Sequence, residues 1–363
     1  MDADFAHRLA SCAAGASLPR HDFLFALADK AASILEHERE PWRPCGPDGA
    51  PGGLLDFTAE PQEQLPLIVV PDLHARAYFL SNLLQFVPPA GFLAPECEGR
   101  SVLEALDAQA VRIVCVGDIL HSELRGRGRW QEAWLEFLNG TETGPAMTAE
   151  MKEGLSLLAM VMELKCAFPA CFHVLKGNHE NIQNEKGGGN FPFCKFANEG
   201  EMVRLFIQKK YGDDVLLIIS CFEKALPLAA AFRECVVSHA EPARFFSRQE
   251  IIGGMQDEAV VRGLTWTEND AAKPGGVQKM LQELTGRQDW QNARYFAGHR
   301  PVKENYALRQ DELFVQLHNT ERQNVALVPQ GRPFRPDEDI RSVAAVEGAP
   351  SADGGSNAAS AES

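Results

Sequence analysis

Short apolar runs, most of them ending in a polar residue, constrain the fold of this chain more than any other feature. There are six: LPLIVV (65–70), VRIVCV (111–116), CFHVLK (171–176), VLLIIS (215–220), ECVVSH (234–239) and ARYFAGH (293–299). Each has the length of a buried strand and is far too short to span a bilayer. Helical patterns at 155–167 and 200–210 separate several of the runs. Apolar strands that alternate with helices predict an α/β fold with strands covered on both faces.

Metal-binding residue types stand where five of these runs end. They are Asp72, His74, Asp118, Asn178, His239 and His299. In α/β folds, ligands bind beyond the carboxyl ends of the strands. At a strand end, the i, i+2 spacing of Asp72 and His74 points both side chains to one side. Gly117, just before Asp118, allows a sharp backbone turn. Mixed oxygen and nitrogen donors suit Mn, Fe, Zn or Co rather than Ca or a structural Zn.

The segments around the runs suggest additions to one main domain. Residues 20–40 have apolar positions at helical spacing, and the Pro- and Gly-rich stretch 41–64 predicts a connecting loop. The end of the chain is small and polar, and cannot bury enough apolar surface to offset its ordering entropy. We therefore expect an N-terminal helical extension and loop (1–62), a main domain (63–330) with an inserted helix and loop at about 122–150, and a disordered tail (331–363).

The charge and the cysteines limit the partners and the compartment. A formal net charge of −15 argues against nucleic acid or an anionic membrane as a partner, because both attract basic surfaces. The nine cysteines form no CxxC pair, and several lie inside apolar runs, as expected of reduced, buried thiols. The first residues lack the basic and apolar regions of a secretion signal. These features predict a cytoplasmic protein.

With these residues in place, the chain resembles the calcineurin-like metallophosphoesterase superfamily, and more closely its phosphoprotein-phosphatase (serine/threonine phosphatase) branch. That branch reads GDxHG, GDxVDRG, GNHE, HGG and GH, where this chain has PDLHA, GDILHSE, GNHE, SHAEP and GHRPV. The similarity extends over roughly residues 65–325. It implies a β-sandwich of two mixed sheets flanked by helices.

The resemblance also implies roles for the strand-end residues. Asp72 and His74 would hold the first of two divalent ions, Asp118 would bridge the pair, and the second ion would be held by Asn178, His239 and His299. Manganese is the ion we expect to support activity in vitro. A water or hydroxide acidified by both ions would attack phosphorus, and Asn178 would also contact the phosphate. His179 matches the general acid that protonates the leaving alkoxide.

Several positions depart from the family pattern. Pro71 and Ala75 replace glycines, which the fold tolerates if the backbone there avoids positive φ. His121 and Ser122 stand where the family has an Asp-Arg pair, whose carboxylate keeps the catalytic histidine protonated and whose guanidinium grips the phosphate. His121 supplies no negative charge to the catalytic site, whereas Glu123 would supply one if its loop turns inward.

Arginines just beyond this departure are candidates for the missing phosphate contact. Arg125 and Arg127, followed by Arg129, carry planar guanidinium groups suited to bidentate phosphate binding. The alternative is a solvated basic loop.

Three functions fit the sequence. The first is hydrolysis of a phosphomonoester, with serine/threonine phosphoproteins as a candidate substrate class. The alternative enzyme is a hydrolase of nucleotides or dinucleoside polyphosphates. The third is a metal-binding scaffold without turnover. In the first two, the partner is a phosphorylated substrate, and no nucleic acid or membrane is expected.

Overall fold

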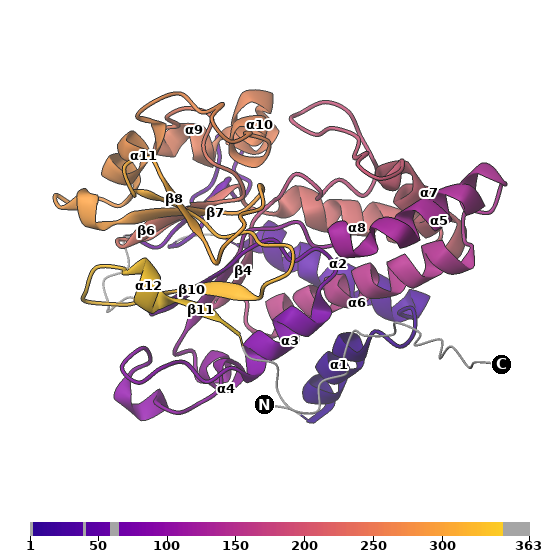
Figure 1. Ribbon diagram of the computed structural model, residues 1–363, viewed down its shortest axis with the longest axis horizontal. Helices are drawn as coiled ribbons and strands as arrows, with labels where there is room; N and C mark the ends of the chain where they lie inside the picture. The colour runs from indigo at the N-terminus through magenta and orange to yellow at the C-terminus, as the bar shows by residue number, and fades with distance from the viewer. Residues whose placement is uncertain (1–2, 39–40, 59–64, 344–363) are drawn as a thin grey trace, which may run out of the picture.

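A sandwich of two mixed sheets with helices on both outer faces forms the centre of the molecule (Figure 1). The computed structural model describes residues 3–38, 41–58 and 65–343. One sheet has five strands in the order β11 (Ile340–Ser342), β10 (Asn324–Val328), β2 (Leu67–Val70), β3 (Arg112–Cys115) and β4 (Phe172–Val174). The predicted fold class, two mixed sheets flanked by helices, is confirmed.

The second sheet has six strands. Their order is β1 (Leu54–Asp56), β5 (Ala229–Ala231), β6 (Cys235–Ser238), β7 (Arg294–Ala297), β9 (Phe314–Gln316) and β8 (Ala307–Arg309). Strands β6, β7 and β9 run parallel to one another, as do β2, β3 and β4 in the first sheet. The carboxyl ends of each parallel trio therefore meet at one edge of their sheet.

Alternation along the strands divides the core into layers. In β2, Ile68 and Val70 join the cluster under the helices, whereas Leu67 and Val69 join the cluster between the sheets. This is the period of two expected of a strand with two buried faces. The same rule gives the six-stranded sheet an outer cluster that includes Val236.

The helices are unequally divided between the two faces. Those packed with the five-stranded sheet are α1 (Ala3–Ala14), α2 (His21–His37), α3 (Ala77–Gln85), α4 (Val102–Asp107), α5 (Arg127–Leu138), α6 (Pro145–Ala167), α7 (Glu199–Tyr211) and α8 (Asp213–Ala225). Those on the six-stranded sheet are α9 (Arg248–Ile252), α10 (Glu258–Thr265) and α11 (Gly276–Leu284). The short turns are η1 (Pro95–Cys97), η2 (Leu124–Gly126), η3 (Gly254–Gln256) and η4 (Trp290–Asn292). No helix in the described part of the chain is long and apolar enough to cross a membrane.

The N-terminal helices pack on the main domain. Helix α2 buries one stripe, which includes Leu24, Ala28 and Leu35, against α6 and α8. Just beyond it, Glu38 forms buried ion pairs with Lys165 of α6 and, at 2.7 Å, with Arg43. The extension is thus tied to the sandwich by both apolar and ionic contacts.

The prediction of a strand at 215–220 was wrong, because this run lies in α8. Val215, Ile219 and Phe222 are buried at helical spacing, while Leu217 is 58% exposed. Asp213 and Asp214 in the first turn favour a helix start through the helix dipole.

Two segments expected to lack structure contribute strands. Within the predicted loop 41–64, β1 pairs in parallel with β5. Within the predicted tail 331–363, α12 (Pro336–Asp339) leads into β11, which pairs antiparallel with β10. Asp339 anchors this segment through an ion pair with Arg332 and a 2.7 Å bond from the Arg335 amide. Residues 344–363 lie outside the described residues.

The predicted insertion at 122–150 is helical at both ends. It contains η2 and α5, and its last residues form the start of α6, which begins at Pro145 rather than near 155. Glu136 of α5 accepts bonds from the amides of Ala146 and Met147, which fixes the start of α6.

Candidate metal centre

Loops that leave strands of both sheets bring the six predicted ligands together. Asp72 and His74 follow β2, and the others follow β3, β4, β6 and β7: Asp118, Asn178, His239 and His299. The six side chains form one cluster. Asp72 Oδ1 lies 3.6 Å from His239 Nδ1, and each of the other side chains has a polar atom within 3.7 Å of another member of the cluster. The cluster sits at the seam between the sheets.

Asp118 occupies the middle of the cluster. Its Oδ2 lies 3.7 Å from His74 Nε2 and 3.5 Å from His239 Nε2. Its Oδ1 accepts a 3.0 Å hydrogen bond from the His179 amide. Burial, followed by the charges of Glu180 and Asp72, raises the pKa of Asp118 well above its usual value. A carboxylate in such surroundings is stabilised in its ionised form by a nearby cation.

The imidazole rings of His74 and His239 are oriented by hydrogen bonds from Nδ1 to backbone carbonyl groups. His74 Nδ1 lies 2.9 Å from the His121 carbonyl, and His239 Nδ1 lies 3.0 Å from the Val116 carbonyl. Each Nδ1 is then the donor, which leaves Nε2 with a lone pair that faces the cluster. Metal-binding histidines are oriented in this way. Burial lowers the pKa of His74 to about 3 and that of His239 well below its usual value, which favours the neutral, metal-binding form.

Asn178 and His299 complete the other side of the cluster. The amide oxygen of Asn178 lies 2.8 Å from His239 Nε2 and 2.9 Å from His299 Nδ1. The His299 backbone amide donates to the Asp72 carboxylate at 3.0 Å. Burial lowers the pKa of His299 to about 4. The amide oxygen and the imidazoles therefore converge on one point.

The backbone is strained at the cluster. His74, Asp118 and His299 have φ of 43°, 53° and 63°, in the left-handed region that side chains disfavour. Strain of this kind concentrates at functional sites. We expected Ala75 to replace a glycine without cost only if its φ is not positive. Its φ is 57°, so the replacement carries a cost in backbone strain. Gly117 has φ of 107°, and a Cβ there would lie 2.8 Å from the Leu175 carbonyl oxygen.

Glu180, the last residue of GNHE, fastens two of the loops together. Its carboxylate accepts hydrogen bonds from the amides of Asp118 (2.9 Å), Ile119 (2.8 Å) and Gly177 (2.7 Å). The first two belong to the loop after β3 and the third to the loop after β4. Glu180 therefore positions Asp118 and Asn178 relative to each other.

His179, the expected general acid, lies beside the cluster. Its Nε2 is 3.7 Å from Asp118 Oδ2, and its Nδ1 is 3.3 Å from His121 Nδ1. Burial, followed by the charge of His121, lowers the pKa of His179 well below its usual value. The ring of Phe193 covers His179, with centroids 3.8 Å apart.

Glu123 turns inward, as its candidate role requires, but its carboxylate contacts other partners. Its Oε2 lies 3.0 Å from His318 Nε2, and its Oε1 lies 2.5 Å from Lys195 Nζ and 3.8 Å from His74 Nε2. His121 is the residue in contact with His179. The candidate source of negative charge, Glu123, therefore contacts His318 and Lys195, whereas the residue beside His179 is His121.

The candidate phosphate arginines have other partners. Arg125 forms an ion pair with Glu153 and donates to the carbonyls of His74 (3.3 Å) and Ala75 (3.0 Å). The Arg127 guanidinium lies 6.0 Å from the centre of the Phe196 ring. Arg129 is paired with Glu150 and, at 2.8 Å, with Glu153. Of these, Arg125 lies nearest the cluster, next to the backbone of His74.

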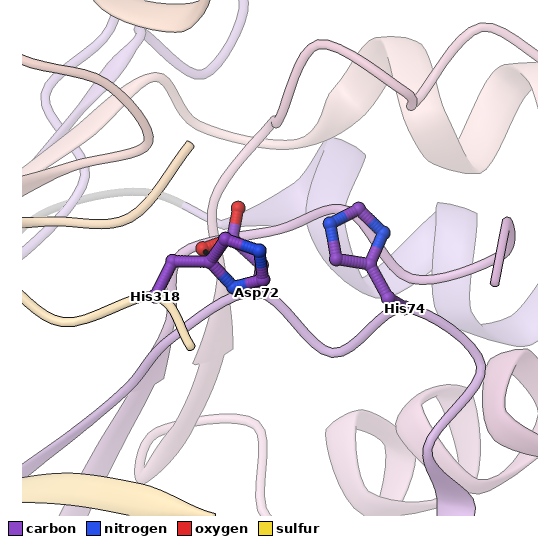
Figure 2. Close-up of side chains that lie close together, drawn as sticks. All are labelled: Asp72, His74 and His318. Carbon is purple, nitrogen blue, oxygen red and sulfur yellow. Dashed lines mark ion pairs between the residues drawn. The ribbon is translucent and has the colours of Figure 1, made fainter. Parts of the chain in front are cut away.

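His318, which sequence analysis missed, lies in the cluster beside Asp72 and His74 (Figure 2). Its Nδ1 is 3.3 Å from Asp72 Oδ2. No local pattern marked it, because its position depends on the parallel pairing of β9, which ends two residues before it, with β7. Lys195, in contact with Glu123, had no signal in the sequence.

The residues of this cluster could hold divalent metal ions. The cluster combines carboxylate, imidazole and amide donors, the set that first-row divalent metals prefer. The Nε2 of His299 and the Nδ1 of His318 are buried and form no hydrogen bond to any described residue. The Nδ1 of His318 lies 3.3 Å from a carboxylate oxygen of Asp72, and a lone pair in that position is stabilised by a shared cation.

Comparisons with known proteins support the fold. No protein-family model matches the chain, and no curated protein matches its sequence. Among solved structures, a protein serine/threonine phosphatase from Saccharomyces cerevisiae, described as similar to human phosphatase PP5, aligns with a TM-score of 0.54 at 14% identity and covers 91% of each chain. A cold-active protein-tyrosine phosphatase of a psychrophile, Shewanella sp., aligns with a TM-score of 0.42 at 13% identity, over 77% of this chain and 80% of that one. The chain therefore shares the fold of the yeast phosphatase.

Proposed function

We propose that the protein is a dinuclear metal-dependent phosphoesterase that hydrolyses phosphomonoesters. The position of Asp118 carries the proposal. Its Oδ2 lies between His74 Nε2 and His239 Nε2, at 3.7 and 3.5 Å. One carboxylate oxygen flanked by imidazoles from two sheets is suited to bridging two ions.

The side chains divide into two groups around Asp118. Asp72 and His74 would hold one ion, and the second would be held by Asn178, His239 and His299. Two bound divalent ions supply Lewis-acid stabilisation of phosphoryl oxygens and acidify water. The protein contributes fixed geometry, since the second nitrogens of His74 and His239 are anchored on carbonyls.

His179 is the group proposed to protonate the leaving oxygen. It lies 3.7 Å from Asp118, at the edge of the proposed metal pair, and its ring contacts that of Phe193. Its buried surroundings favour the neutral imidazole. Substrates with good leaving groups, which need little protonation, are therefore expected to react fastest.

The surroundings of the cluster suit a substrate with an extended apolar part. Phe191 and Trp266 pack edge to face at 5.2 Å, and Trp266 lies 6.4 Å from His299. With Phe193 they form a half-buried aromatic patch next to His179 and His299. We favour a phosphorylated amino acid in a protein over a small phosphate metabolite, with phosphoserine and phosphothreonine as the classes that the resemblance implies.

Hydrolysis of a chromogenic aryl phosphate tests the proposal. The full chain with Mn²⁺ should turn over the ester, and Asp118→Asn should lower kcat by a factor of about 10³ or more, because the bridging charge is lost. Absence of turnover with Mn, Fe, Zn and Co alike would refute the proposal and favour a scaffold. A panel of phosphopeptides, nucleotides and phosphodiesters then separates the protein-phosphatase assignment from a nucleotide hydrolase.

A further inference from the structure

The contacts of His318 place it directly beside the first proposed metal position. Its side chain is fully buried, and Nδ1 lies 3.3 Å from Asp72 Oδ2. Two ligands of one ion, each about 2.1 Å from it, lie about 3.0–3.4 Å apart in octahedral or tetrahedral geometry. The observed separation falls in that interval. Figure 2 shows His318 approaching Asp72 from the loop after β9.

The other ring nitrogen of His318, Nε2, forms a hydrogen bond with Glu123. His318 Nε2 lies 3.0 Å from Glu123 Oε2, so it donates its proton to that carboxylate. Nδ1 then carries a lone pair, and it forms no hydrogen bond to any described residue although it is buried. A lone pair that faces the Asp72 carboxylate at 3.3 Å is repelled unless a proton or a metal cation lies between the two, and a metal cation is what both groups bind as ligands.

The loop that carries His318 is fixed to the loop that carries Asp72. The buried Arg76 guanidinium donates to the Asp72 carbonyl (2.5 Å) and to the carbonyls of Asn319 (3.0 Å) and Arg322 (2.9 Å). The Val302 amide donates to the His318 carbonyl at 2.8 Å. These bonds preorganise the position of His318, as binding sites require.

Glu123 is in turn held by an ion pair with Lys195. Lys195 Nζ lies 2.5 Å from Glu123 Oε1. A recess of about 10 Å³, lined in part by His74, Glu123 and His318, adjoins this pair, and it has room for about one small ion or water. A carboxylate that accepts a hydrogen bond from a metal-binding histidine orients the imidazole and raises its basicity. Glu123 is placed to do this for His318.

We propose that His318 Nδ1 is a further ligand at the first metal position, and that Glu123 is the positioning residue that holds His318 Nε2. This inference rests on the proposed function for the existence of the metal pair. It gives each position three donors of its own in addition to the bridging Asp118, and the first differs in having the Asp72 carboxylate where the second has the neutral Asn178 amide. The first ion is therefore expected to bind more tightly than the second.

Metal content tests the inference without relying on activity. The wild-type chain is loaded with Mn²⁺ and desalted, bound Mn per chain is measured by mass spectrometry, and both affinities are measured by equilibrium dialysis. We expect two ions in the wild type. In His318→Gln, one of the two should bind at least about tenfold more weakly, while the other is unchanged. Glu123→Gln should weaken the same ion by about 10–100-fold, the usual effect of losing an outer partner.

Controls separate this result from misfolding and from failure of the proposed function. His37→Gln, an exposed histidine on α2, should bind as the wild type does. Thermal unfolding in a chelator shows whether each variant folds without metal. Two ions at unchanged affinity in His318→Gln would overturn the inference and leave the proposed function standing, as would an equal weakening of both ions. No Mn retained by the wild type would instead overturn the proposed function itself.

Discussion

His121 Nδ1 and His179 Nδ1 lie 3.3 Å apart, so one imidazole donates a hydrogen bond to the other, at the position where the phosphatase branch that the sequence resembles has an aspartate. Both rings are buried, and burial lowers the pKa of His121 to about 3. The pair therefore favours a neutral His179, which has consequences for leaving-group preference and for pH dependence.

Replacing His179 with asparagine should separate substrates by leaving group. An alkyl phosphate depends on protonation of its leaving oxygen, so kcat for a phosphoserine peptide should fall by about 10²–10⁴. An aryl phosphate has a good leaving group and should lose much less. Steady-state kinetics with the two substrates checks this, and equal losses for both would contradict a proton-donor role.

A carboxylate in place of His121 should extend activity to higher pH. Protonated His179 is lost as pH rises through its pKa, which burial and His121 both lower, so wild-type activity on alkyl phosphates should fall as pH rises. His121→Asp adds a negative charge that raises the pKa of His179, and should move the alkaline limb of the kcat profile by about one pH unit or more. His121→Asn, which adds no charge, is the matched control and should leave the limb in place.

Substituting Glu180 with glutamine should loosen the loops that carry Asp118 and Asn178. The carboxylate accepts three backbone amide bonds, and an amide in its place cannot accept all of them. We expect a loss of about 1–3 kcal/mol in the free energy of unfolding in urea. Glu185→Gln, whose carboxylate is partly exposed and paired with Lys224, should change this free energy by less than about 1 kcal/mol.

Glycine at position 75 should stabilise the protein. Ala75 has φ of 57°, which costs a side-chain-bearing residue about 1–2 kcal/mol, and glycine avoids that strain. After the greater chain entropy of glycine is subtracted, we expect a gain of about 0.5–1 kcal/mol in urea unfolding. Ala31→Gly in the interior of α2, also buried, should be destabilising, and a loss in both variants would show that φ at position 75 imposes no strain.

The sequence was informative where a polar residue directly follows an apolar strand. Asp118 and Asn178 follow apolar runs, and the pattern predicts ligands beyond the carboxyl ends of such strands; the two strands are adjacent and parallel in the structure. The run at 215–220 was misleading because five apolar residues in a row look like a buried strand. The 215, 219, 222 spacing and the acids before it indicate the helix that forms.

His318 could not be recognised in the same way. It stands among polar residues in QLHNTE, and its role depends on β9 lying next to β7, which no local pattern specifies. The partners of Glu123 depend likewise on residues 72 and 195 positions further along the chain. Tertiary pairing, rather than local preference, decides which side chains join such a cluster.

The position of the cluster between the two sheets has a consequence for when metal can bind during folding. Asp72 leaves one sheet and His299 the other, and the bond between them joins positions 227 residues apart. Neither half of the chain presents a complete set of ligands, so a cleaved or half-folded molecule should capture metal poorly. Tight metal binding would therefore require that both sheets have folded and packed together.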